Sequence, residues 1–158
     1  MSQPPLSSLY QQLILEHYRN PRNKEELPER TVEVHMANPV CGDEIRLQLR
    51  VYEGRITHAR FVGQGCSISQ ASISMMTDLL EDRSLDEAEG LQRRFTEMMH
   101  GDAEAAKDRT LGDLRALQGV SKFPVRIKCA LLGFDALGEA LERSGHSASD
   151  EARRGEPH

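Results

Sequence analysis

Residues 31–62 read TVEVHMANPVCGDEIRLQLRVYEGRITHARFV, and this stretch decides the fold. Apolar and polar residues alternate along 32–36 and 45–51, and less regularly along 56–62. Alternation with a period of two is typical of strands that bury one face. Glu53 and Gly54 supply a turn between the second and third segments. The stretch therefore predicts three antiparallel strands, the first two joined through residues 37–43.

The sequence on both sides of these strands has helical periodicity. Apolar residues recur there at spacings of three and four, which is typical of helices with one buried face. The segments are 6–18, 68–80, 85–99 and 124–141. Residues 100–112 are charged and contain two glycines, which indicates an exposed linker, and 114–120 suggests one further helical turn. The pattern predicts an α+β fold, a three-stranded antiparallel sheet packed against helices.

The length and composition fit a single cytoplasmic domain. A chain of 158 residues is long enough to bury a core without disulfides. No segment has the roughly 18–20 consecutive apolar residues of a membrane span, so no membrane partner is expected. The N-terminal MSQPPLSSLY has neither the basic region nor the apolar run of a signal peptide. The polar tail, residues 144–158, has little to bury and is predicted to be disordered.

The charge balance argues against nucleic acid as a partner. The chain has 25 acidic and 20 basic residues and a formal charge of −5. Proteins that track phosphates usually carry a clustered basic excess. There is no tryptophan, and phenylalanine and tyrosine are few, so platforms for base stacking are poorly supported.

The three cysteines are the strongest candidates for chemistry. Cys41 lies between two predicted strands, Cys66 lies between the third strand and a helix, and Cys129 lies in the first turns of the last helix. A disulfide is not expected in the cytosol, so the thiols need another explanation. Asp43 adds a carboxylate, and three thiolates with one carboxylate form a tetrahedral set that Zn²⁺ accepts.

Spacing alone leaves a simpler explanation open. Free cysteine is among the most frequently buried residue types, and burial as a small hydrophobe explains any one of these thiols equally well. The sequence has no CxxC pair, and long stretches separate the three cysteines. The loop positions of Cys41 and Cys66, together with Asp43, favour a shared metal site.

Three motifs, in order, resemble the iron–sulfur cluster assembly family of IscU and the NifU N-terminal domain. They are N-P-V-C-G-D at 38–43, G-x-G-C-x-I-S-x-A-S-x-S-M-M at 63–76, and R-x-K-C-A-x-L at 126–132. The resemblance covers about residues 5–143 and is closest to the SufU branch. IscU-type scaffolds carry a histidine where this chain has Lys128, and residues 85–112 resemble the SufU-type insertion. The resemblance implies an IscU-like domain over residues 1–143.

The resemblance also implies a site and a partner. SufU-like proteins bind zinc through residues that match Cys41, Asp43, Cys66 and Cys129. They accept persulfide sulfur from a SufS-type cysteine desulfurase, and a downstream cluster scaffold is a possible further partner. IscU-type relatives instead assemble a [2Fe–2S] cluster on the same cysteines, so iron or a cluster is the alternative cofactor.

The chemistry of transfer suggests a role for each group, as a hypothesis. Cys41 is the expected sulfur acceptor, because a loop ligand beside Gly42 can move at little backbone cost. Arg126 and Lys128 flank Cys129 in the sequence and are expected to stabilise developing negative charge. The chain would then act as a sulfurtransferase together with the desulfurase.

Overall fold

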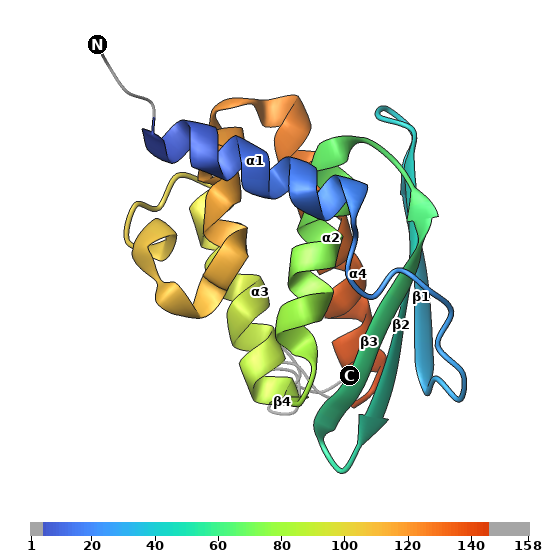
Figure 1. The fold of residues 1–158 in the computed structure, drawn as a ribbon. Coiled ribbons are helices and arrows are strands. Elements are labelled where there is room, and N and C mark those ends of the chain that lie inside the picture. The colour runs from blue at the N-terminus through green and yellow to red at the C-terminus, as the bar shows by residue number, and fades with distance from the viewer. Residues whose placement is uncertain (1–4, 146–158) are drawn as a thin grey trace, which may run out of the picture.

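A computed structural model describes residues 5–145, and the side chains of residues 10–145. The predicted disorder of the tail concerns mainly residues 146–158, which lie outside the described residues. The α+β prediction is confirmed, and Figure 1 shows the helices gathered on one side of the sheet. The elements in chain order are α1 (Pro5–Arg19), β1 (Val32–Asn38), β2 (Asp43–Tyr52), β3 (Arg55–Gln64), α2 (Ser67–Leu80), β4 (Arg83–Ser84), α3 (Leu85–Met99), the 3₁₀ helices η1 (Ala105–Lys107) and η2 (Arg109–Lys122), and α4 (Pro124–Arg143).

The sheet is antiparallel, and its strands lie in the order β1-β2-β3-β4. The prediction of three strands was wrong by one. Residues 83–84 of β4 pair with Arg55 and Ile56 of β3. A strand of two residues is too short to show alternation, so the sequence pattern could not reveal it. Residues 83 and 84 leave most of that edge of β3 open, and the loop after α1 occupies part of it, where Phe61 N donates to Asn23 O at 3.0 Å.

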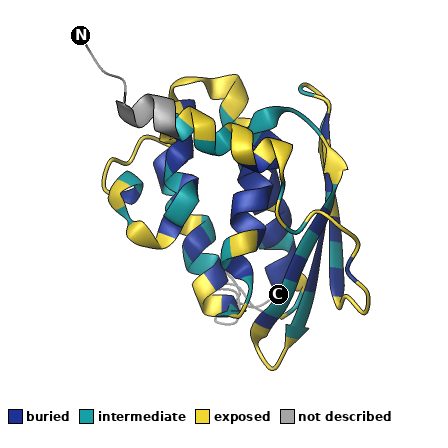
Figure 2. Cartoon of the chain, viewed as in Figure 1, coloured by how far each residue is buried: buried dark blue, intermediate teal, exposed yellow. Residues whose placement is uncertain are grey.

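The core lies between the sheet and the helices and also among the helices. Figure 2 shows buried residues where these elements face one another and exposed residues on their outer sides. Alternate residues of β2, such as Leu47 and Leu49, are fully buried beneath the helices. Between α3 and α4 the rings of Phe95 and Phe134 stack with centroids 4.4 Å apart. The hydrophobic face predicted for each of these helices is therefore the face that packs.

The exposed linker predicted for residues 100–112 was only partly correct. The segment contains η1 and the start of η2, and Ala105 and Leu111 within it are fully buried. Gly112 has a positive φ of 52°, so the chain bends there. The two buried apolar side chains hold this charged, glycine-containing segment against the rest of the protein. The average composition of the segment is polar and gave no indication of this packing. Residues 109–122 are therefore ordered and pack against α1.

Candidate metal centre

Cys41 is held in the tight connection between β1 and β2. Asn38 and Asp43 are paired across the two strands, so only four residues form the loop. The backbone N–H of Cys41 donates to Asn38 O at 3.2 Å, and the Asn38 side-chain oxygen accepts from Val40 N at 3.2 Å. Gly42 has a φ of +72°, a conformation that glycine adopts without strain. The turn projects the half-buried Cys41 thiol at the end of the sheet.

Asp43 begins β2, and its carboxylate is buried, with 1% of the residue exposed. One oxygen, Oδ1, accepts a hydrogen bond from Cys66 N at 2.8 Å. The other, Oδ2, lies 3.9 Å from Cys66 Sγ. Gly65 makes this approach possible, because a Cβ there would lie 2.5 Å from Asp43 Oδ1. Gly65 of the G-x-G-C motif thus allows the Asp43 carboxylate to pack against the N-terminus of α2.

Cys66 is the N-cap of α2. Its backbone is extended (φ −73°, ψ 170°), and Ser69 N donates to its sulfur at 3.5 Å. The free N–H groups of a helix N-terminus favour negative charge, so this position suits a thiolate. Cys66 is half-buried, which leaves its sulfur partly accessible.

Cys129 comes from the second turn of α4 and is fully buried. Its sulfur lies 3.0 Å from the sulfur of Cys41 and 3.9 Å from Val125 O. Burial raises the pKa of the Cys129 thiol strongly, and its contacts with Cys41 and Asp43 raise it further. Without a cation the thiol is therefore protonated, whereas a metal ligand must be a thiolate.

The four predicted ligands meet at one end of the sheet, although not equally closely. Ligand atoms of Cys41, Asp43 and Cys129 all lie within 4.8 Å of one another. Cys66 joins this group through its contact with Asp43. Tetrahedral zinc with bonds of about 2.0–2.3 Å separates its donor atoms by roughly 3.5–3.8 Å. Small side-chain movements bring the four donors to that spacing, so the residues present fit a zinc ion.

The two basic residues expected at the site are placed differently. The Arg126 guanidinium lies near the sulfurs of Cys66 and Cys129, and the charge that these sulfurs carry as thiolates raises the pKa of Arg126. Lys128 is exposed and makes no hydrogen bond or ion pair with the described side chains. On a helix Arg126 and Cys129 are three residues apart and share a face, whereas Lys128 points elsewhere. The spacing of three residues between Arg126 and Cys129 was visible in the sequence, and it distinguishes Arg126 from Lys128 as the cation near the thiols.

A polar cluster around the buried His17 lies away from the thiols, and no motif in the sequence indicated it. His17 of α1 is 1% exposed, and its ring contacts Ser74 Oγ at 2.8 Å and Asp113 Oδ2 at 3.0 Å. Ser74 is fully buried and also accepts from the Arg22 backbone N–H. Because Ser74 is buried and its hydroxyl is already hydrogen-bonded, the cluster serves to connect α1, α2 and η2.

The chain is similar to proteins of iron–sulfur cluster assembly. Residues 9–130 match the NifU-like N terminal domain family. The chain is 48% identical over 143 residues to the zinc-dependent sulfurtransferase SufU of Bacillus subtilis, covering 89% of this chain and 96% of that protein. It is 40% identical over 147 residues to the iron–sulfur cluster assembly scaffold protein IscU of Streptococcus pyogenes, covering 93% and 91%.

Solved structures agree with this similarity. A crystal structure described as a putative iron–sulfur cluster assembly scaffold protein for the SUF system, from Fervidobacterium islandicum, superposes with a TM-score of 0.75 at 27% identity. That superposition covers 82% of this chain and 93% of the other. A NifU-like N-terminal protein from Brucella abortus has a TM-score of 0.78 at 22% identity, covering 90% and 99%, which supports the fold.

Proposed function

The chain belongs to the NifU-like N-terminal domain family, and from this we propose that it is a zinc-binding sulfur acceptor. It takes persulfide sulfur from a SufS-type cysteine desulfurase in the cytosol, for iron–sulfur cluster assembly. The observation that carries the proposal is the convergence of three thiols and a buried carboxylate from three separate segments of the chain. No helix within residues 5–145 is long and apolar enough to cross a membrane.

Cys41, Asp43, Cys66 and Cys129 would hold the zinc. When bound, the ion supplies positive charge that keeps the thiols deprotonated near neutral pH. The Cys129 thiol needs this charge most, because burial favours its protonated form. Arg126 adds a second positive charge beside the sulfurs. The site thereby offers a thiolate as nucleophile.

Cys41 is the thiol best placed to receive sulfur. Its neighbour Val40 is 80% exposed and Gly42 has open space around it, so the turn can move without disturbing the core. The Cys41 thiolate attacks the outer sulfur of the desulfurase persulfide. A new S–S bond forms on Cys41, the bond within the old persulfide breaks, and the desulfurase cysteine leaves as a thiolate. Arg126 stabilises the charge on the new persulfide, and the exposed Lys128, one residue before Cys129, adds to the positive charge of this region.

Measurements on the purified protein and on two variants test the proposal. The purified protein should contain one zinc per chain, and it should accelerate cysteine turnover by a SufS-type desulfurase. Persulfide labelling after mixing should mark Cys41. A Cys41→Ser variant that accepts sulfur at the full rate, together with a Cys66→Ser variant that does not, would show that the acceptor is assigned to the wrong thiol.

A scaffold that assembles a [2Fe–2S] cluster on the same cysteines is the second candidate. Relatives named as IscU scaffold proteins match most of the chain, and the donor set suits iron as well as zinc. Anaerobic purification separates the two functions. A brown protein with iron and acid-labile sulfide, which does not accelerate the desulfurase, would favour the scaffold.

A further inference from the structure

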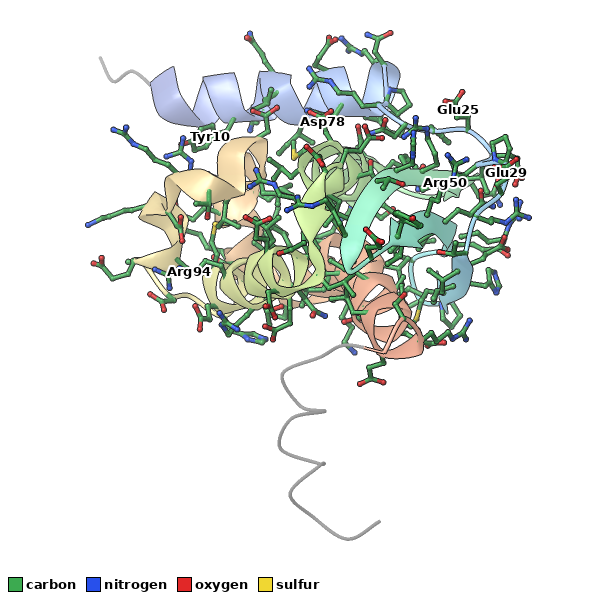
Figure 3. All side chains as sticks on the ribbon, turned by 90° about the horizontal axis from the view of Figure 1, so that it is seen from below. Tyr10, Glu25, Glu29, Arg50, Asp78 and Arg94 are labelled. Carbon is green, nitrogen blue, oxygen red and sulfur yellow. The ribbon has the colours of Figure 1, made fainter. Side chains whose placement is uncertain are left out.

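A groove of about 810 Å³ runs between α1 and η2 and ends beside the thiols. Figure 3 labels Tyr10 on α1, next to the turns of η2. Ser67 and Ile68 of α2 and Arg126 of α4 form the end near the metal ligands, because Ser67 follows Cys66 and Arg126 lies near its sulfur. Residues at this end of the groove therefore also lie beside the proposed metal centre.

The lining of the groove differs from the rest of the surface in its charge. The described residues that line it include Lys122 and Arg126 but no aspartate or glutamate, in a chain with 25 acidic residues. Neither cation has a carboxylate partner among the described side chains, whereas Arg46 and Arg94 each pair with two acidic side chains. The groove can therefore accept negative charge from outside.

The other groove residues are a mixture of apolar and neutral polar residues. Ile14, Ile68 and Val120 contribute apolar side chains, and Phe123 is 60% exposed at the rim. Val125, which is 61% exposed, lies beside Cys129, and Val40, which is 80% exposed, precedes Cys41, so exposed apolar side chains also flank the thiols. Exposed apolar residues that gather on one surface mark sites of interaction.

We infer that the groove binds a segment of the desulfurase that carries a carboxylate and at least one bulky apolar side chain. This inference rests on the proposed function. The apolar side chain packs on Ile14, Ile68 and Phe123, while the carboxylate pairs with Lys122 and Arg126. An acidic segment fits because the groove offers two cations without a carboxylate of their own. Docking at the groove places the desulfurase against the turn that carries Cys41.

The test measures binding of the zinc-loaded protein to a SufS-type desulfurase by calorimetry. Lys122→Glu reverses a charge at the rim, and Phe123→Ser removes an exposed ring, so each should weaken Kd about tenfold. Neither residue is a metal ligand, so zinc content and thermal unfolding should stay unchanged. Lys107→Glu on η1 is the matched control, because Lys107 is exposed and outside the groove, and its Kd should stay within about twofold of wild type.

A photo-crosslinker at the exposed Gln118, which lines the groove, identifies the occupant by mass spectrometry. One desulfurase peptide that contains an acidic residue supports the inference. An unchanged Kd for Lys122→Glu, a crosslinked peptide without acidic residues, or a crosslink to a second copy of this chain overturns it. If the wild-type protein binds the desulfurase through the groove but receives no sulfur, the proposed function fails and the docking site stands.

Discussion

Replacing Gly65 with alanine tests whether the Asp43 carboxylate is held as described. The new Cβ would lie 2.5 Å from Asp43 Oδ1 and 2.6 Å from Ser69 Oγ, closer than real Cβ atoms come. Asp43 is 1% exposed, so its carboxylate has no open solvent into which it can turn. The substitution therefore forces the carboxylate away from Cys66 N, to which it is hydrogen-bonded at 2.8 Å.

The cost follows from the bond that is lost. A hydrogen bond to a charged group is worth about 1.5–3 kcal/mol, and we expect the free energy of unfolding of the metal-free protein to fall by about that amount. Partners that orient a metal ligand typically contribute about 10–100-fold to metal affinity. Zinc affinity should therefore fall by about 10–100-fold in Gly65→Ala.

Urea unfolding with chelator present measures the first effect, and competition with a chromophoric chelator measures the second. Gly90→Ala in α3 is the matched control, because the nearest atom to its Cβ would be Arg93 Nη2 at 3.9 Å. Alanine suits a helix interior better than glycine by about 0.5–1 kcal/mol, so this variant should be slightly more stable and bind zinc normally. If Gly65→Ala matches wild type in both assays, the carboxylate is not positioned as described and the reasoning is refuted.

Three further predictions concern pH and the core. The pKa of the Cys129 thiol is raised in the folded protein, so above about pH 8.5 the thiol loses its proton in the unfolded chain before it does so in the folded one. The stability of the metal-free protein is therefore fully present below that pH, and it falls by up to about 1.4 kcal/mol per pH unit above it. Urea titrations with reductant at pH 7.5 and 9.5 should show this fall, and Cys129→Ala should reduce it. His17→Ala should cost about 2–4 kcal/mol because it removes a buried ring and leaves Ser74 without that partner, and an unchanged melting temperature would contradict the cluster. Phe95→Ala should cost about 3–5 kcal/mol in urea unfolding, since it leaves a cavity against Phe134, and a loss below 1 kcal/mol would mean that α3 does not pack there.

Much of the fold was predictable from local pattern. Alternation along 32–36 and 45–51 identified strands, and helical periodicity identified α1 to α4, because each element buries one face and its sequence period records which face. The two-residue β4 and the packed segment after α3 escaped prediction. Both depend on a few contacts, such as the burial of Ala105 and Leu111, rather than on a repeated pattern.

The sequence by itself determined the fold class, the family and the candidate metal ligands, because these depend on residue identity and order. Only the tertiary structure decided which groups meet. It brought the Asp43 carboxylate to the backbone of Cys66 and buried Cys129. It also placed Arg126 near the thiols and Lys128 on another face of α4, because residues two apart on a helix do not share a face. It also placed η2 against α1 and so made the groove. These features arise from contacts between residues far apart in the chain, which spacing along the sequence does not encode.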